Sequence, residues 1–231
     1  MSFFSTRETF DLHFNKLLDD VLVLCCMAEQ ALTGAVVMIK RRDLEGSRRI
    51  YENDERINVK RYEIEQNCLT LIATQQPMAR DLRLLAAILE IITELERIAD
   101  YGKGIARINI LLGEEQLVKP LIDIPKMAEL GVDMLHRALT AFINKDAEAA
   151  RLIPNDDDII DGLYNRVYRD LLDIMIADPS TIDRATHLIW AAHNLERLAD
   201  RVTNICERII FVATGEIKEL DHMDSEETLS I

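Results

Sequence analysis

Apolar residues recur every three or four positions along almost the whole chain, which is the period of one face of an α-helix. In the first such stretch, from about Thr6 to Arg42, the apolar positions are Phe10, Phe14, Leu17, Leu18, Val21, Leu24, Ala28, Ala31, Ala35 and Met38. Glycine and proline number only 8 and 5, and aromatic residues make up 5% of the chain. Long helices with aliphatic cores need few turn residues, so the pattern predicts an all-α protein.

Turn residues divide the chain into about six predicted helices. The first three cover residues 6–42, 43–74 and 77–112, and the last three cover 125–144, 146–177 and 179–213. Pro77 suits the first turn of the third helix, and Pro154 predicts a kink in the fifth. Asp178 can cap the start of the last helix, and Gly215 can end it.

The most informative feature is an internal repeat. The hexamer Leu-Glu-Arg-Ile-Ala-Asp at 95–100 returns as Leu-Glu-Arg-Leu-Ala-Asp at 195–200, and Asp-Glu-Arg-Ile-Asn at 54–58 is matched by Asp-Asp-Ile-Ile-Asp at 157–161. Several matches in the same order predict two copies of a three-helix unit. We assign residues 1–115 to the first copy, 120–216 to the second and 217–231 to a polar acidic tail.

Each copy places carboxylates one helical turn apart, where residues i and i+4 share a face. The paired positions are Glu96 with Asp100, Glu196 with Asp200, Asp54 with Asn58, and Asp157 with Asp161. Hard oxygen ligands suit Mg²⁺, Mn²⁺, Ca²⁺ or iron, and helical bundles build metal sites from carboxylates on facing helices. Alternatively, each pair is a solvated surface with ordinary ion pairs to Arg97 and Arg197. The duplication favours binding of a metal ion or a partner.

The charge balance is 27 basic against 41 acidic residues, a net charge of −14. Such a surface repels phosphate backbones, which disfavours nucleic-acid binding and favours a cation or a basic protein partner. The alternative is that the charge only keeps the protein in solution. We find no signal-peptide pattern, and no uncharged apolar stretch reaches the roughly 18 residues of a membrane span. The four cysteines form no Cys-x-x-Cys, and we expect buried free thiols in a reducing cytoplasm.

Motifs of common enzymes are missing from the sequence. It contains no phosphate-binding Gly-x-x-x-x-Gly-Lys, no Gly-x-Gly-x-x-Gly, no His-Glu-x-x-His and no Gly-x-Ser-x-Gly. A carboxylate-bridged di-iron site needs two Glu-x-x-His motifs, and the single one here joins Glu219 to His222 in the polar tail. His193, three residues before Glu196, is a further candidate ligand, although a structural or exposed histidine is the alternative.

The chain resembles the PhoU family in the duplicated hexamer, in the segment Gln-Gln-Pro-Met-Ala-Arg-Asp-Leu-Arg at 75–83, and in the late Asn-Ile at 204–205 with Thr-Gly-Glu at 214–216. These are accessory and regulatory proteins of bacterial phosphate-specific transport, and the likeness runs from about Thr6 to Glu216. The resemblance implies two pseudo-symmetric three-helix bundles, similar to spectrin repeats, in a cytoplasmic homodimer. It also implies a negative regulator of the phosphate-starvation response that acts between the phosphate ABC transporter ATPase and a sensor histidine kinase. Membrane association would be peripheral, through the transporter alone.

The resemblance further implies bound metal ions, including multinuclear iron clusters, on Glu/Asp-x-x-x-Asp motifs. The matching positions are Glu96, Asp100, Glu196, Asp200, Asp54, Asp157 and Asp161, with Asn58 where an acid would complete the motif. An amide oxygen can ligate but brings no charge, so we expect the second-half site to be the stronger one. The identity of the ion, whether iron, Mg, Mn, Ca or Zn, stays open.

Three hypotheses follow. The first is a non-enzymatic regulator of phosphate uptake with metal-binding acidic faces. The second is an enzyme that uses clustered carboxylates as a di-metal site, which would require a deep pocket beside the acids. The third is a helical adaptor whose acids bind no metal.

Overall fold

The computed structural model describes residues 6–216 and 219–220, and within them the chain is helical with no strand. The helices of the first half are α1 (Thr6–Arg41), α2 (Leu44–Gln75) and α3 (Ala79–Leu112). The second half contains α4 (Asp123–Asn144), α5 (Ala147–Leu152), α6 (Asp157–Ala177) and α7 (Ile182–Thr214), with the short 3₁₀ helices η1 (Ile153–Asp156) and η2 (Pro179–Thr181). The all-α prediction is confirmed.

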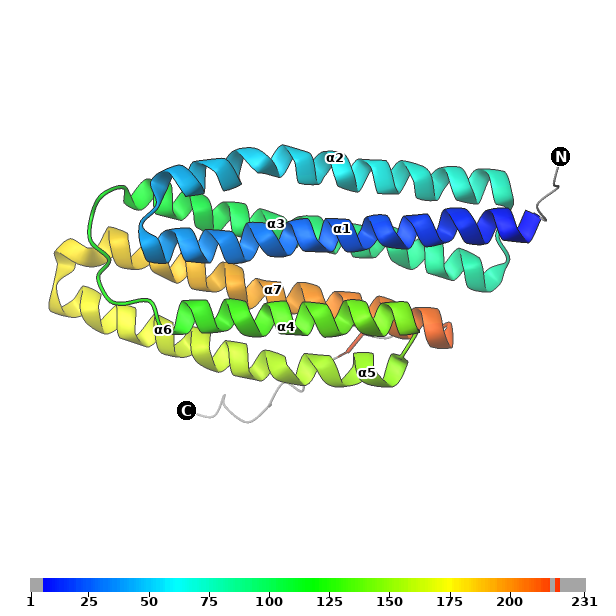
Figure 1. Cartoon of the computed structure of the whole chain (residues 1–231). Coiled ribbons are helices and arrows are strands. Elements are labelled where there is room, and N and C mark those ends of the chain that lie inside the picture. Colours follow the sequence, from blue (N-terminus) through cyan, green and yellow to red (C-terminus); the bar gives the residue numbers. More distant parts are fainter. Residues whose placement is uncertain (1–5, 217–218, 221–231) are drawn as a thin grey trace.

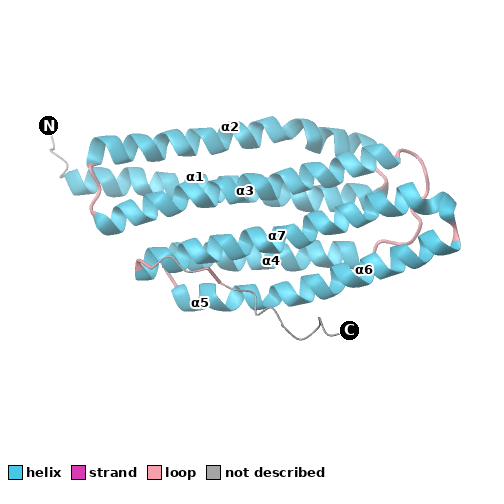
Figure 2. Cartoon of the chain, turned by 180° about the vertical axis from the view of Figure 1, so that it is seen from behind, coloured by secondary structure: helices cyan, strands magenta, loops and turns pink. Residues whose placement is uncertain are grey.

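Two three-helix bundles lie side by side with their long axes roughly parallel (Figure 1). One consists of α1, α2 and α3, and the other consists of α4, α7 and the broken helix formed by α5, η1 and α6. The bundles meet mainly where α3 packs against α7, which the view from behind shows at the centre (Figure 2), and α1 also packs against α4. Each central helix therefore has one face for its own bundle and another for the neighbouring bundle, and the predicted pair of pseudo-symmetric bundles is confirmed.

Helix ends follow local chemistry. The Asp43 carboxylate accepts a hydrogen bond from the Gly46 amide at 2.7 Å and caps α2. Gln76 ends this helix in the left-handed conformation, with φ of 46°. The prediction for Pro77 is wrong, because α3 begins two residues later at Ala79 with Met78 as its cap. Gly215, with φ of 80°, ends α7 as predicted, in a conformation that glycine adopts without a Cβ clash.

The second bundle differs from the first by a break in its middle helix. Asp146 caps α5 by accepting from the Ala149 amide at 3.0 Å, and Pro154 then sits in η1 before α6 begins. A proline inside a helix removes a backbone donor and displaces the preceding turn, so the predicted kink is confirmed. Asp178 accepts from the Ser180 amide at 3.0 Å and caps η2, directly before α7.

The hydrophobic core is continuous through both bundles. Its centre is built from α3 and α7, which bury Leu85, Ile88, Ile92, Leu95, Ile98, Leu188, Leu195, Leu198, Val202 and Cys206. Burying each such side chain stabilises the fold by roughly 1.5–3 kcal/mol. Cys25, Cys68 and Cys206 are buried, but Cys26 is exposed, so the expectation of four buried thiols is wrong for Cys26.

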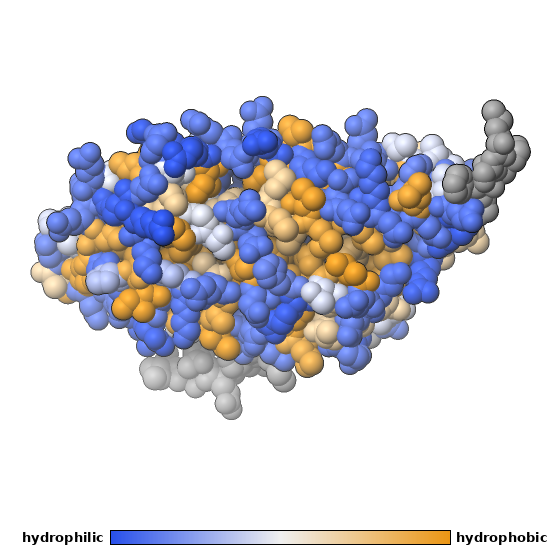
Figure 3. Space-filling model, viewed as in Figure 1, coloured by the Kyte–Doolittle hydropathy of each residue, from blue (hydrophilic) through white to orange (hydrophobic). Residues whose placement is uncertain are grey.

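One helix, α1, is long and apolar enough by length and composition to cross a membrane. Core helices of water-soluble proteins meet the same criterion, and α1 supplies the fully buried Leu24, Leu32 and Ile39 to the core. Only 39% of its most apolar window is buried, however. Apolar surface accordingly interrupts the hydrophilic surface along the face that α1 and α4 share (Figure 3).

The assigned boundary between the copies, 115–120, falls in the connection from Gly113 to Ile122 that links α3 to α4. The assigned tail, 217–231, lies outside the described residues except for positions 219 and 220.

Candidate functional site

The acidic face of the first bundle lies between α2 and α3. Asp54 on α2 is buried, with its side chain 7% exposed, and its Oδ2 accepts a hydrogen bond from the Asn58 amide nitrogen at 3.1 Å. The Lys103 ammonium on α3 donates to the same Asp54 oxygen at 2.6 Å and lies 3.9 Å from Asp100. A lysine therefore joins the predicted acids of the two helices.

Burial and mutual repulsion shape the protonation of these groups. Burial raises the pKa of Glu96, and the charges of Asp100 and Asp54 raise it further against the opposing charge of Arg61. Burial likewise raises the pKa of Asp100, with Asp54 adding to it and Lys103 opposing it. The hydrogen bond to Asp54 raises the pKa of Lys103, which stays an ammonium.

The acidic face of the second bundle lies between α6 and α7. Asp157 is buried, at 3% exposure, while Asp161 one turn later is exposed. On α7, Glu196 Oε2 lies 3.1 Å from Nδ1 of His193. Burial raises the pKa of Glu196, and the charges of Asp200 and Asp161 add to the effect. The structure thus places His193 beside Glu196, as the sequence suggested.

An aromatic side chain borders this second face. The ring of Tyr164 on α6 lies 6.0 Å from the ring of His193, and 6.4 Å from the ring of Tyr168. Burial raises the pKa of the Tyr164 phenol, and the charge of Glu196 raises it further. Tyr164 corresponds to Arg61 in the first repeat, so the second repeat has a neutral ring where the first repeat has a cation.

The donor chemistry of both faces suits hard cations, because carboxylate and amide oxygens are the ligands they prefer. Within residues 6–216 and 219–220, however, no three His, Cys, Asp or Glu side chains converge closely enough to hold a metal ion. The acids are neighbours on paired helices but do not form a pre-built coordination shell. Metal binding by the eight residues therefore stays a prediction.

The arginines of the two hexamers, Arg97 and Arg197, contact residues other than the glutamate that precedes each of them. Arg97 pairs with Glu94 at 3.1 Å, and Arg201 from the other bundle reaches the same Glu94 at 3.3 Å. The Arg197 guanidinium lies over the ring of Tyr101, 5.3 Å from its centroid. The contacts of Arg201 and Arg197 join α7 to α3, whereas the ion pair of Arg97 lies within α3. The charges of Arg97 and Arg197 oppose only in part the rise in the pKa of Glu96 and of Glu196.

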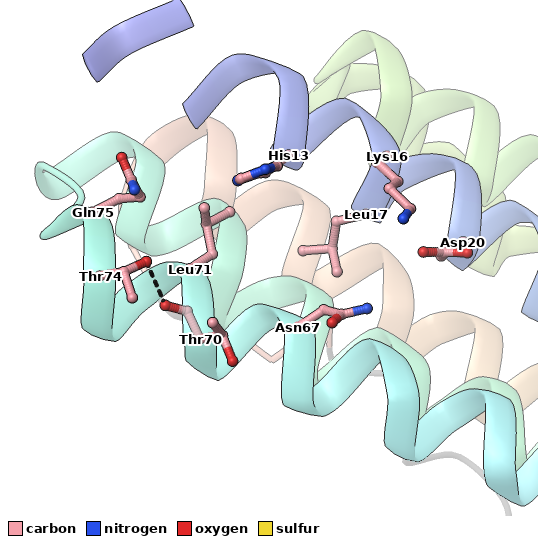
Figure 4. A pocket seen from close by; sticks show the side chains of 9 residues that line it. All are labelled: His13, Lys16, Leu17, Asp20, Asn67, Thr70, Leu71, Thr74 and Gln75. Atoms are coloured by element: carbon pink, nitrogen blue, oxygen red, sulfur yellow. Dashed lines mark hydrogen bonds between the residues drawn. The ribbon is translucent and has the colours of Figure 1, made fainter. Parts of the chain in front are cut away.

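A separate cavity of about 500 Å³ opens between the N-terminal half of α1 and the C-terminal half of α2. Leu17 and Leu71 form its apolar floor, and His13, Lys16 and Asp20 contribute ionisable groups to its rim (Figure 4). Asp20 is engaged by Lys60. The paired acids of the hexamers do not line this cavity, so the combination of a deep pocket with clustered carboxylates that an enzyme would need is not assembled here.

Lys103 is the functional-site residue that the sequence reasoning missed. The signal was available in the repeat itself, because the hexamers at 95 and 195 set the alignment that pairs Lys103 with Thr203.

Comparisons with known proteins agree on one family. A sequence model described as the PhoU domain matches residues 22–108 and again residues 124–209. A relative from Aquifex aeolicus, named phosphate-specific transport system accessory protein PhoU homolog, is 32% identical over 205 residues, which cover 89% of this chain and 93% of that protein. A relative of the same name from Caulobacter vibrioides is 38% identical over 191 residues, covering 82% and 83%.

Solved structures give the same result. The crystal structure of PhoU from Pseudomonas aeruginosa matches with a TM-score of 0.84 at 29% identity, covering 90% of this chain and 100% of that one. The phosphate transport system regulatory protein PhoU from Streptococcus pneumoniae matches with a TM-score of 0.83 at 31% identity, covering 90% and 99%. The two family matches fall on the two helical bundles, one each.

Proposed function

Because the chain belongs to the PhoU family, we propose that it is an accessory protein of phosphate-specific transport that regulates phosphate uptake without catalysing a reaction. The observation that carries the proposal is the duplicated PhoU domain, which accounts for both bundles and leaves no additional catalytic domain among the described residues. Relatives are named as accessory or regulatory proteins, which supports a role in control rather than in chemistry.

The finer proposal concerns partners. We assign the chain to the cytoplasm as a homodimer that reports the state of the phosphate ABC transporter ATPase to a sensor histidine kinase and restrains the phosphate-starvation response. Two similar bundles joined along α3 and α7 present two related but unequal surfaces. A scaffold of this kind can hold two partners at once, which is what a coupling protein requires. The net charge of −14 favours basic partner surfaces.

Metal binding is a separate part of the proposal. Burial and like charges raise the pKa of Glu96 and of Glu196, so both carboxylates lie in sites that disfavour their negative charge. A cation would relieve that repulsion. The second face carries acids at all four motif positions, so we expect it to bind ions such as Mn²⁺, Mg²⁺ or iron more tightly than the first.

Co-purification tests the regulatory role. The full chain with an affinity tag is mixed with the detergent-solubilised transporter and, separately, with the cytoplasmic part of the sensor kinase, each from the same organism, at high and low phosphate. We expect retention of both partners, weakened by high salt because the contacts are charged. Retention of neither partner, with or without phosphate and Mn²⁺, would refute the proposal.

Two other hypotheses are decided by further measurements. Phosphatase or phosphotransfer activity that requires Mn²⁺ and is lost in Glu196→Gln would favour an enzyme. A protein purified without chelator that contains no stoichiometric metal, yet still captures both partners, would favour a metal-free adaptor.

A further inference from the structure

The first acidic face already contains a cation that belongs to the chain. The Lys103 ammonium lies 2.6 Å from Asp54 and 3.9 Å from Asp100, and thus reaches an acid on each of the two helices. It also lies 5.4 Å from the centre of the Tyr51 ring, at a distance where a cation is attracted to the face of an aromatic ring. Three groups on α2 and α3 therefore hold this ammonium in place.

Asp54 needs such a partner. Its side chain is 7% exposed, and an isolated buried carboxylate is costly unless it is paired and hydrogen-bonded. Lys103 supplies the charge, and the Asn58 amide supplies a second hydrogen bond to the same oxygen. The residue that looked like a weakened metal ligand, Asn58, acts here as a hydrogen-bond donor to Asp54.

An ammonium and a metal ion would exclude each other at this place. Divalent cations sit about 2.0–2.6 Å from carboxylate oxygens, which is the space that the Lys103 nitrogen takes up beside Asp54 Oδ2. Bringing a second cation next to the first would also add like-charge repulsion in a partly buried site. Metal could reach Oδ2 of Asp54 only after the lysine had left.

The second repeat lacks this arrangement. Thr203 stands at the position of Lys103, and Asp161 stands at the position of Asn58. The exchange at these two positions removes one positive charge and adds one negative charge, and the replacement of Arg61 by Tyr164 removes a further positive charge, although the hexamers are nearly identical. The imidazole of His193, 3.1 Å from Glu196, is a group that is charged only when protonated.

We propose that Lys103 is a tethered cation that takes the place of a bound metal ion in the first repeat, so that this repeat is complete without metal. Lys103 would fill this site whether or not the chain is a regulator and whether or not the second repeat binds metal.

The test uses the full chain with the second face silenced by Glu196→Gln and Asp200→Asn, so that any remaining metal effect reports on the first face. In this background, the chain that retains Lys103 should have the same melting temperature in EDTA and in Mn²⁺, and should carry no stoichiometric metal by mass spectrometry. Adding Lys103→Thr, the residue of the second repeat, should lower the melting temperature in EDTA. Mn²⁺ should then restore it, with binding of about one ion per chain.

Three control variants separate this effect from a general loss of charge. Lys126→Thr removes an exposed lysine of α4 and should show neither the loss nor the rescue by Mn²⁺. Lys103→Arg keeps a cation and should remain indifferent to Mn²⁺. Lys103→Thr combined with Asp54→Asn removes both charges and should regain stability in EDTA without needing the ion.

Two results would overturn the proposal. One is Mn²⁺ binding to the silenced background with Lys103 intact, lost on Glu96→Gln and Asp100→Asn. The other is a Lys103→Thr chain that is as stable in EDTA as its parent or that gains no response to Mn²⁺. Neither outcome bears on co-purification with the transporter or kinase, so failure here is distinct from failure of the proposed function.

Discussion

Gly102 on α3 packs directly against the backbone of α1. A Cβ placed there would lie 2.7 Å from the carbonyl carbon of Ala31 and 2.7 Å from the backbone nitrogen of Leu32, both on α1. Ordinary van der Waals contact begins at 3.4 Å, and backbone atoms cannot rotate away as a side chain can. Gly102→Ala would therefore force α1 and α3 apart by roughly 0.7 Å, in a core that is packed like an organic crystal.

The magnitude follows from two opposing terms. Alanine is a better helix former than glycine by about 1 kcal/mol, which stabilises the variant. Overpacking a tight core costs typically 1–3 kcal/mol, and a clash with backbone belongs near the upper end. We expect Gly102→Ala to lose about 2 kcal/mol of unfolding free energy, which for a chain of this length lowers the melting temperature by about 4–8 °C. Urea denaturation followed by circular dichroism measures the first quantity, and calorimetry the second.

The same substitution elsewhere provides matched controls. A Cβ at Gly162, on the exposed face of α6, meets nothing within 4 Å, so Gly162→Ala should stabilise by about 0.5–1 kcal/mol. At Gly131 on α4 the added atom would meet the end of the Leu198 side chain at 2.3 Å, which can move, so the effect should lie between the other two. A Gly102→Ala chain as stable as the wild type, or a Gly162→Ala chain that is less stable, would refute this reasoning.

Three further predictions concern buried polar groups and thiols. The fully buried Asn109 amide donates to Ser47 Oγ at 2.8 Å, to the Asp43 carbonyl at 3.2 Å and to the Met38 carbonyl at 3.3 Å. Asn109→Ala should therefore lower the free energy of unfolding by roughly 2–3 kcal/mol, measured by urea denaturation. An unchanged denaturation midpoint would contradict this. Ellman's reagent should label Cys26 in the native protein, whereas Cys25, Cys68 and Cys206, whose pKa burial raises to about 12, should react only on unfolding; rapid labelling of more than one thiol would count against the packing. Burial and Asp200 raise the pKa of Glu196 above its unfolded value, so the folded chain binds this proton more tightly than the unfolded chain and the free energy of unfolding falls as pH rises from about 4 towards neutrality. In EDTA, the free energy of unfolding of Glu196→Gln should fall less with rising pH and should exceed that of the wild type at neutral pH. An equally steep fall in the variant would show that Glu196 does not cause it.

Helix positions were predictable because they depend on local information. The spacing of Leu195, Leu198 and Val202 reports the helical period directly. Asp43 and Asp178 cap helices through amides two or three residues away. Pro77 was misplaced because α2 ends at Gln76 in a left-handed conformation, which glutamine rarely adopts and which its presence in the sequence does not predict. Cys26 was misplaced because it follows a buried cysteine in an apolar run, and the helical period rather than hydrophobicity decides its exposure.

Within the site, the sequence could predict which acids share one helix but not what faces them. The pairing of Glu96 with Asp100 follows from the pitch of α3, whereas the contact of Lys103 with Asp54 depends on how α2 docks on α3. The same applies to Glu94 and Arg201, which meet only because α3 packs against α7. Contacts between helices depend on the packing of whole faces, and no local motif encodes them.

A weaker metal site in the first half was predicted from Asn58 alone, and the structure adds a second difference between the two acidic faces, the Lys103 ammonium beside Asp54. A missing carboxylate would merely weaken a metal site, leaving Asp54, Glu96 and Asp100 to bind an ion less tightly. A lysine nitrogen 2.6 Å from Asp54 makes the site different in kind, because the negative charge of Asp54 is already balanced by a side chain of the same protein. The duplicated fold therefore has one copy that carries its own cation and another that carries an additional carboxylate. If Lys103 acts as proposed, an added cation would bind to the face that lacks the lysine.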